Sequence, residues 1–400
     1  MRILKVVQAY YPFQEKGGPV VKVGALARGL AQRGHRVTVL TADLGVRNYR
    51  GAGVKFEACK WGWRSEQDGI EVIYLSTVGH YRAVTLNPRI AGFCRESMNR
   101  FDVAQIYGLY DWLGPAAGFF CRRRGVPYVL EPMGMFRPIV RNIALKRFYH
   151  GVFGNSLVAG ARFLIATSEQ ERQELIEGAV AASRIVVRRN GIELPERLPN
   201  RGEFRRIWGI PEDARVVLFL GRVVSKKSPD LLLDAFSRWH RNPGNENSVL
   251  AIVGPDEGDG FLARLKMMAR RLNLSRSVRF VGPLYETAKW QAYRDADVFV
   301  LPSQNENFGN TAVESAACGT PVIVTDQCGV ARFVGSAGLV VPHDPRAIEE
   351  ALAQLLGDPN LRARCEDGCA EMTRNLSWEG PLDQNEQLYA RCVMRRTEES

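Results

Sequence analysis

The stretch Asp297–Asp326, DVFVLPSQNENFGNTAVESAACGTPVIVTD, decides the fold of the chain. It opens with an apolar, β-branched run at Val298–Leu301, which is short enough to be a buried strand, and closes with a second run at Pro321–Thr325. A polar loop and a short helical segment lie between them. The helical segment is predicted to stop at Gly319, because glycine suits the left-handed position after a helix. This order predicts one unit of an open parallel sheet, in which ligands bind at the carboxyl ends of strands.

The composition limits the class of protein. A length of 400 residues exceeds what one hydrophobic core usually serves and predicts two domains. No apolar run approaches the roughly 18–20 residues that a membrane span needs, and the first residues show no signal-peptide pattern. The eight cysteines are scattered, without a CxxC pair or a histidine at metal-ligand spacing. We therefore expect a cytoplasmic protein with reduced thiols and no metal site.

The net charge of +11 is unevenly distributed. Residues 1–190 hold 28 Lys and Arg against 14 Asp and Glu, a net charge of +14, whereas the remaining residues have a net charge of −3. This asymmetry suggests that the first half faces an anionic partner, either nucleic acid or a membrane surface, with a merely basic, soluble face as the alternative. The basic segment 136–159 is predicted to be helical, and it either lies on a membrane surface or packs on its own domain.

Strand and helix patterns alternate through both halves. Those predicted in the first half are strands at 3–9, 36–41, 70–75, 103–107, 128–131 and 163–167, and helices at 19–33, 88–99 and 112–124. Those predicted in the second half, besides the opening stretch, are strands at 216–220, 249–253, 278–281 and 339–341, and helices at 230–239, 261–272, 347–356 and from 378. The rhythm predicts an α/β protein with two Rossmann-like, doubly wound domains.

A turn-rich linker at 188–198 separates the two halves. The predicted domains are residues 1–189, residues 190–378, and a C-terminal helix within 379–400 that packs back on the first domain.

Two stretches carry residues that can bind phosphate. Gly17-Gly18 precede a predicted helix, where free N–H groups and the helix dipole favour an anion, although an ordinary turn explains them equally well. Arg222 and Lys227 follow a predicted strand, where cations can clamp a diphosphate, although solvated surface charge is the plainer explanation. Neither stretch fits the GxGxxG or Walker patterns, which argues against nicotinamide and P-loop sites.

The opening stretch contains two carboxylates eight residues apart, Glu306 and Glu314. Glu306 lies in the loop at the strand end, where it can accept hydrogen bonds from the hydroxyls of a ligand. The backbone N–H groups of Phe308, Gly309 and Asn310 are expected to point into the same crevice if the helix begins there. Glu314 has a structural alternative, because the Thr-x-x-Glu sequence that ends at this residue fits a capping box.

The order of these landmarks resembles the GT-B glycosyltransferases, specifically the large retaining family four, or group one. The landmarks of the second half are Asn190-Gly191-Ile192, Gly221-Arg222 with Lys227, Gly254, Phe280-Val281-Gly282, and PSQNENFGNTAVESAACGTPVI with its E-x7-E pattern. In the first half, Gly17-Gly18 followed by LARGLAQRGHRVTVLT matches the first domain of the family. Each motif alone is weak, whereas the ordered set is specific and runs through nearly the whole chain.

The resemblance implies two domains that face each other across a cleft, and transfer of a sugar from a nucleotide diphosphate sugar, UDP- or GDP-linked, with retention of configuration. By this resemblance Arg222, Lys227 and Glu306 are catalytic: the two cations would hold the diphosphate, and Glu306 the donor sugar. Glu314 would bind the ribose. The other donor-binding residues that the family implies are Gly17, Gly18, Gly254, Val281, Phe308, Gly309 and Asn310. Cations and helix N-termini would make a metal or other cofactor unnecessary.

The chain departs from the family on the acceptor side. Many relatives carry a D-x-x-H-x-H segment, in which Gln105 and Tyr107 replace the histidines here, and neither is a good base at neutral pH. Asp111, Glu131 or the departing phosphate is then predicted to activate the acceptor. Ser228 also replaces the usual glycine after the lysine.

The sequence thus predicts a retaining, metal-independent glycosyltransferase of cell-surface polysaccharide or lipopolysaccharide biosynthesis. The basic first domain would bind a saccharide acceptor at the inner face of the membrane. The resemblance to the family implies that this acceptor is lipid-linked. Three alternatives stay open: a nucleotide-sugar epimerase, a catalytically silent binder of the same fold, and a nucleic-acid-binding protein. The last of these leaves the strand-end motifs unexplained, so nucleic acid is not expected as a partner.

Overall fold

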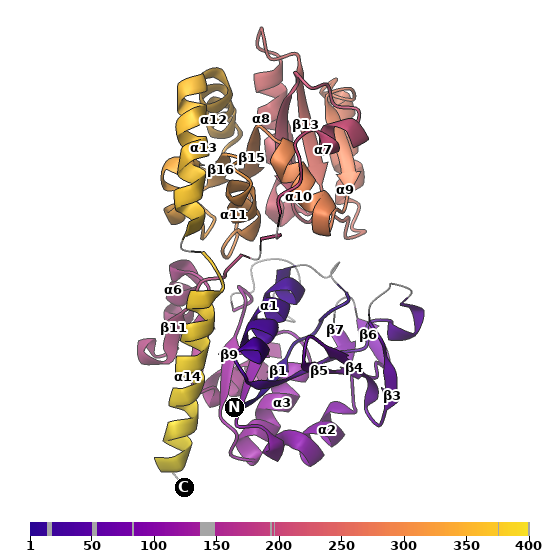
Figure 1. Cartoon of the computed structure of the whole chain (residues 1–400), viewed down its shortest axis with the longest axis vertical. Helices are drawn as coiled ribbons and strands as arrows, with labels where there is room; N and C mark the ends of the chain where they lie inside the picture. Colours follow the sequence, from indigo (N-terminus) through magenta and orange to yellow (C-terminus); the bar gives the residue numbers. More distant parts are fainter. Residues whose placement is uncertain are drawn as a thin grey trace. The chain divides into compact units, whose positions relative to one another are not determined.

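The computed structural model describes residues 1–13, 18–49, 54–81, 84–136, 149–192, 194–195, 197–374 and 376–398. The chain divides into two compact units (Figure 1). The first unit joins Met1–Gly191 to Trp378–Ser400, and the second is Ile192–Ser377. Each has its own parallel sheet and its own core, so the protein is α/β with two Rossmann-like domains. The boundary between the units lies two residues beyond the one predicted from the sequence.

The first unit is built on a nine-stranded sheet in the order β11-β10-β9-β8-β1-β2-β5-β4-β3. Its strands are β1 (Arg2–Val6), β2 (Arg36–Ala42), β3 (Glu57–Cys59), β4 (Gly62–Gln67), β5 (Ile70–Leu75), β8 (Val103–Tyr107), β9 (Tyr128–Glu131), β10 (Phe163–Ala166) and β11 (Ile185–Val187). The strands pair in parallel from β11 to β5, and β3, β4 and β5 form an antiparallel meander. The strand order reverses between β1 and β8, where an open sheet forms a ligand-binding crevice.

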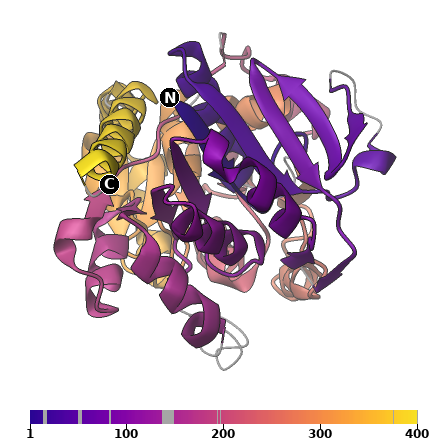
Figure 2. The same ribbon diagram turned by 90° about the horizontal axis from the view of Figure 1, so that it is seen from below.

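Both faces of this sheet are covered, and its central strands are mostly apolar on both sides, with Lys5, Gln105 and Glu131 as buried exceptions. In β1, Leu4 and Val6 contribute to one core cluster, whereas Ile3, and Val7 directly after the strand, contribute to the other, as the alternation of side chains along a strand requires. The helices on the first face are α2 (Ile90–Ser97), α3 (Leu113–Arg123), α5 (Asn155–Gly160) and α6 (Glu169–Glu177). The helices on the second are α1 (Gly18–Gln32) and α14 (Glu379–Glu398), and α14 runs beside the first unit in both ribbon views (Figures 1 and 2).

The second unit has a six-stranded, fully parallel sheet in the order β14-β13-β12-β15-β16-β17. Its strands are β12 (Arg215–Leu220), β13 (Ser248–Val253), β14 (Val278–Gly282), β15 (Val298–Leu301), β16 (Val322–Thr325) and β17 (Gly338–Val341). Its principal helices are α7 (Glu203–Ile207), α8 (Pro229–His240), α9 (Phe261–Arg271), α10 (Glu286–Asp295), α11 (Asn310–Ala317), α12 (Pro345–Gly357) and α13 (Pro359–Arg374). The order reverses between β12 and β15, so the loops that follow these two strands border the second crevice.

The structure contains elements that the sequence did not predict. These are the strands β3, β4 and β11, a small hairpin of β6 (Gly79–Tyr81) with β7 (Val84–Leu86), and the helices α6, α7, α10 and α13. Within the helix predicted over 136–159, the described residues form a π-helical turn at His150–Gly154 followed by α5. Residues 137–148 lie outside the described part of the chain. No helix in the described ranges has the length and apolar character needed to cross a membrane.

Candidate active site

The candidate site of the second unit lies where β12 and β15 end side by side. Lys227 ends a short 3-10 turn beyond β12, and its ammonium forms an ion pair with the carboxylate of Glu306, in the loop after β15. Their side chains are 19% and 17% exposed. The backbone N–H of Gln304 donates to the carbonyl of Lys226 over 3.1 Å and ties the two loops together. Two of the three residues predicted to be catalytic are therefore in contact.

Arg222, the third residue predicted to be catalytic, lies just after β12 and next to a second carboxylate. Its guanidinium forms an ion pair with Glu257, and the two side chains are 51% and 42% exposed. Burial, followed by the charge of Arg222, lowers the pKa of Lys227 to about 8. Lys227 is therefore mostly protonated at neutral pH, and two cations follow the end of β12, each paired with a carboxylate.

Glycines allow the neighbouring strand ends to converge. Gly254, directly after β13, has a φ of +148°, and a Cβ there would lie 1.7 Å from the carbonyl oxygen of Gly221. The N–H of Gly254 donates to the carbonyl of Gly282 at the end of β14 over 2.8 Å. Val281 lies beside Gly282 and is partly buried against the core. The predicted donor-binding residues Gly254 and Val281 are thus both at carboxyl ends of strands.

The amino terminus of α11 is fixed beside the loop that carries Glu306. Phe308 is buried, with its ring 6.0 Å from the ring of Phe333, and anchors the loop. Gly309 precedes the helix with a φ of +105°, and a Cβ there would meet Val330 at 2.9 Å. Asn310 is the first helical residue. The positive end of the helix dipole lies at this terminus, where it favours an anionic ligand.

Glu314 joins α11 to α10. Its carboxylate accepts hydrogen bonds from Lys289 Nζ and from the hydroxyl of Tyr293, each over 2.9 Å. The capping-box interpretation is wrong, because the helix is preceded by Gly309 without a side-chain cap, and Thr311 already lies inside it. The side chain of Glu314 is 15% exposed and is held in one orientation.

Two structural partners of the site were not predicted from the sequence. The segment after β16 holds Glu306 through its backbone: Glu306 N–H donates to Gln327 over 3.1 Å, and Gly329 N–H donates to Glu306 over 2.8 Å. Ser228 lies in the left-handed region at φ +50°, where a glycine is favoured, and its hydroxyl lies 3.0 Å from His343 Nε2. The Gln327 and His343 partners come from distant strand ends, so nothing local in the sequence indicates them.

In the first unit, the predicted phosphate-binding glycines lie between β1 and α1. Gly17 is outside the described residues, and Gly18 is the first residue of α1. A Cβ at Gly18 would meet nothing within 4 Å, so the space beside this helix terminus is open. The crevice side of the first unit therefore also has a helix N-terminus at the predicted position.

Three of the four residues predicted on the acceptor side are in the interior of the first unit. Gln105, Tyr107 and Glu131 are at most 1% exposed. Gln105 Nε2 donates to Glu131 over 3.0 Å, and Lys5 Nζ donates to the hydroxyl of Tyr107 over 2.8 Å. The prediction that these side chains face an acceptor is wrong, because both faces of β8 and β9 are covered.

Glu131 is the centre of a buried charge cluster. It forms ion pairs with Lys22 and with Arg188, the latter over 2.8 Å, and both cations are at most 5% exposed. Arg188 also donates to Asn385 of α14 over 2.8 Å. Burial acts to raise the pKa of Glu131, but Arg188 and Lys22 outweigh it and hold this pKa below its ordinary value. Glu131 therefore remains ionised and is a structural counter-ion.

Asp111 is the one acceptor-side candidate that lies beyond a strand end. It follows β8 and accepts a hydrogen bond from the N–H of Gly114 over 2.6 Å, which fastens the start of α3. Burial raises the pKa of Asp111 to about 6. Asp111 is 6% exposed, so it is largely buried at the start of α3.

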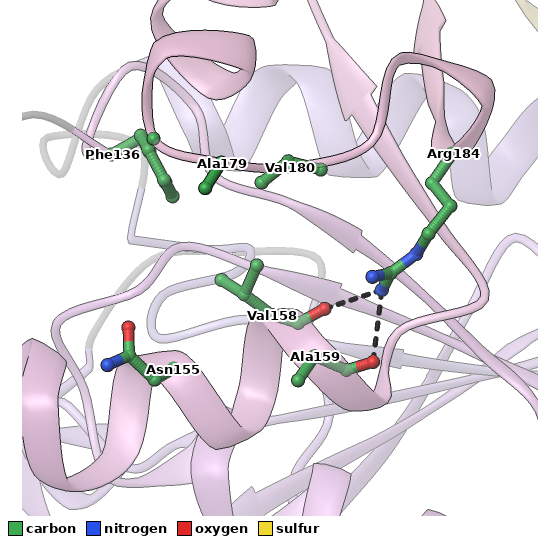
Figure 3. A pocket seen from close by; sticks show the side chains of 8 residues that line it. Phe136, Asn155, Val158, Ala159, Ala179, Val180 and Arg184 are labelled. Carbon is green, nitrogen blue, oxygen red and sulfur yellow. Dashed lines mark hydrogen bonds between the residues drawn. The ribbon is translucent and has the colours of Figure 1, made fainter.

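A hollow of about 150 Å³ lies between α5 and the turn after α6 (Figure 3). The residues that line it are Phe136, Asn155, Val158, Ala159, Gly178, Ala179, Val180 and Arg184. The guanidinium of Arg184 donates to the carbonyls of Val158 and Ala159 over 2.7 and 3.1 Å, so its charge caps the end of α5. Within the described ranges, no group of three or more His, Cys, Asp or Glu side chains is arranged to hold a metal ion.

Known proteins resemble this chain in both sequence and structure. Residues 200–371 match the family described as glycosyl transferases group 1, and residues 17–191 match the glycosyl transferase 4-like domain. D-inositol 3-phosphate glycosyltransferase 2 of Catenulispora acidiphila is 33% identical over 310 residues, which cover 72% of this chain and 72% of that protein.

Two solved structures superpose on nearly the whole chain. Alr3699/HepE of Anabaena, in complex with UDP and glucose, has a TM-score of 0.77 at 18% identity and covers 98% of this chain and 100% of its own. Sucrose-phosphate synthase of Thermosynechococcus elongatus has a TM-score of 0.76 at 21% identity and covers 98% of each chain. These likenesses establish that the fold is GT-B.

Proposed function

The chain belongs to the group 1 glycosyltransferases, and on that basis we propose that it transfers a sugar from a UDP-sugar to a membrane-anchored saccharide with retention of configuration. The observation that carries the proposal is the meeting of Lys227, Glu306 and the start of α11 where the strand order of the second sheet reverses. Such a crevice binds ligands in open α/β sheets. Its groups are those that a diphosphate and a sugar require: cations, a helix N-terminus and a carboxylate.

Arg222 and Lys227 would bind the diphosphate. Both are paired with carboxylates, so a bound donor would exchange Glu257 and Glu306 for phosphate oxygens. As the bond to the sugar breaks, negative charge grows on the leaving phosphate, and fixed cations and a helix terminus stabilise that charge without reorganisation. We propose that these groups suffice and that no metal cofactor takes part.

Glu306 would then be free to accept hydrogen bonds from the donor sugar. Glu314 is turned towards Lys289 and Tyr293 of α10, so the two glutamates do not form the opposed acid and base of a glycosidase. Departure and attack on the same face of the sugar would let the leaving phosphate take the proton of the acceptor. Asp111 is the alternative base, because its pKa of about 6 suits proton transfer near neutrality.

The acceptor has two candidates. A lipid-linked saccharide, used at the inner face of the membrane in cell-surface polysaccharide or lipopolysaccharide assembly, is supported by the net charge of +14 in residues 1–190. D-inositol 3-phosphate is the second candidate, because the relative in Catenulispora acidiphila is named for transfer to it. UDP is supported as the donor nucleotide by the Anabaena structure that holds UDP and glucose.

A binding and turnover screen tests the proposal. Calorimetry with UDP, GDP and ADP should show UDP binding tightest, and the UDP-sugar should be consumed only when an acceptor is present. Nuclear magnetic resonance of the product then gives the configuration of the new bond. Release of an epimerised sugar without an acceptor product would overturn the proposal in favour of an epimerase, and DNA binding with a steep salt dependence would favour a nucleic-acid role.

A further inference from the structure

Helix α3 is apolar on both of its sides. The sequence 112–121, WLGPAAGFFC, contains no charged side chain. One side packs on the core through Leu113 and Ala117, which are fully buried. On the other side Trp112 and Phe119 lie two helical turns apart and are 40% and 48% exposed. A surface helix normally carries polar residues on its outer side, so this side is built to be covered by a partner.

The neighbouring turn extends this surface. Phe153 lies in the π-helical turn before α5, and its ring centroid is 5.1 Å from that of Trp112. Val152, beside it, is 49% exposed. We call Trp112, Phe119, Val152 and Phe153 the aromatic face. Its side chains are large and exposed, and the helices that carry them are held in place because α3 packs on α5.

Arginines adjoin the aromatic face at the end of α3. Arg122, Arg123 and Arg124 are consecutive and exposed, and none of them pairs with a carboxylate among the described residues. Arg122 and Arg124 donate instead to backbone carbonyls. Among the described residues between 103 and 168, the basic side chains are Arg122, Arg123, Arg124 and Arg162, and the acidic ones are Asp111 and Glu131, which are both buried. The surface is therefore positive, with no exposed carboxylate from this part of the chain to oppose an anion.

We propose that the aromatic face, with Arg122–Arg124, docks on an anionic phospholipid bilayer. Tryptophan and phenylalanine enter the boundary between headgroups and acyl chains, and arginines pair with lipid phosphates. A protein partner or a second copy would need the apolar residues but not the unopposed arginines, so the charge favours the bilayer.

The placement connects this surface to the proposed acceptor, and in this respect the inference rests on the proposed function. Trp112 follows Asp111, at the carboxyl end of β8 and beside the crevice of the first unit. A saccharide whose lipid anchor stays in the bilayer would be presented at this edge. The surface thus identifies the partner as an anionic membrane and the docking element as α3.

Vesicle flotation tests the proposal. The full chain is mixed with vesicles of phosphatidylcholine alone or with about 30% phosphatidylglycerol. We expect at least about tenfold stronger partition into the anionic vesicles, weakening with added salt. Arg123→Glu should reduce this partition roughly tenfold or more, since each basic residue near an anionic surface contributes a factor of about five. The double variant Trp112→Ser/Phe119→Ser should reduce it by a similar factor.

A matched control comes from the second unit, where Ile207 and Met267 are 57% and 48% exposed. The double variant Ile207→Ser/Met267→Ser should float like the unchanged protein, and thermal unfolding of every variant should show that the fold is kept. Equal binding to both vesicle types, or none, would overturn the proposal. So would a change from dimer to monomer in the Trp112→Ser/Phe119→Ser variant, which would make the face a protein interface.

Calorimetry with UDP separates this proposal from the proposed function. Normal UDP binding by a protein that does not float would remove the docking surface and leave the transferase assignment standing. Flotation without UDP binding would support the docking surface and count against the donor assignment.

Discussion

Replacing Glu306 by glutamine should tighten nucleotide binding and at the same time slow sugar transfer. The carboxylate of Glu306 pairs with Lys227, one of the two cations proposed to hold the diphosphate. A nucleotide must therefore displace Glu306 before its phosphates reach the ammonium. Glu306→Gln keeps the shape of the side chain and removes the competing charge.

The size of the effect follows from the burial of the pair. Exposed ion pairs contribute about 0.2–1 kcal/mol, and breaking a buried pair costs about 3–5 kcal/mol. The side chains of Lys227 and Glu306 are 19% and 17% exposed, which places the pair between these limits. A competing interaction of about 1–2 kcal/mol corresponds to UDP binding roughly 5–30 times more tightly. Transfer should slow by about 10–150-fold, because a charge-assisted hydrogen bond to the sugar contributes about 1.5–3 kcal/mol.

Calorimetry with UDP at pH 7 measures the first effect, because Lys227, with a pKa of about 8, is still mostly protonated there. Turnover of the UDP-sugar measures the second. Glu257→Gln is the matched control: its pair with Arg222 is about half exposed, so UDP affinity should rise by no more than about fivefold. A Glu306→Gln variant that unfolds normally and binds UDP no more tightly would refute the competition, and normal turnover would refute the role of Glu306 in holding the sugar.

Three further predictions concern pH, strand convergence and the buried charges. UDP affinity should fall by up to about tenfold per pH unit above pH 8 as Lys227 loses its proton, and calorimetry of Lys227→Met should show no such dependence. Gly254→Ala should lower the free energy of unfolding in urea by about 2–3 kcal/mol, because its Cβ would meet the backbone at 1.7 Å, whereas Gly244→Ala, with open space around it, should cost only the roughly 1–2 kcal/mol of its left-handed conformation. Glu131→Gln should cost about 3–5 kcal/mol in the same measurement by leaving two buried cations without their carboxylate, and a loss below about 1 kcal/mol would contradict the charge cluster.

Local patterns predicted most of the fold. The bounds predicted for 70–75, 103–107, 128–131 and 298–301 are those of β5, β8, β9 and β15, because buried parallel strands are short apolar runs. The strand β4, GWRSEQ, was missed because it is mostly polar and has no clear alternation of apolar and polar residues to recognise.

In the candidate site, too, the sequence predicted the local position of each residue but not the contacts between residues that are distant in the chain. Lys227 and Glu306 could be placed at strand ends from their own neighbourhoods, but their contact follows only from β12 pairing with β15. Glu131 was wrongly predicted to lie on the acceptor side. The local sequence around a carboxylate at a strand end does not tell whether its side chain faces a ligand-binding crevice or the protein interior. The cations that neutralise it, Lys22 and Arg188, come from α1 and from beyond β11, and no local pattern indicates that they converge.

The core of the first unit is completed by α14, which follows the whole second unit in the sequence. Tyr389 is fully buried in the first unit, where Lys5 donates to its hydroxyl over 3.3 Å. Lys5 precedes the whole of the second unit, Ile192–Ser377, in the chain, and Tyr389 follows it, so the two residues are synthesised on either side of a complete domain. During synthesis, the core of the first unit therefore stays incomplete until the second unit and then α14 have been made. The second unit is continuous in the gene and can be excised as one fragment, whereas any fragment that ends at Gly191 lacks the helix that closes its own core.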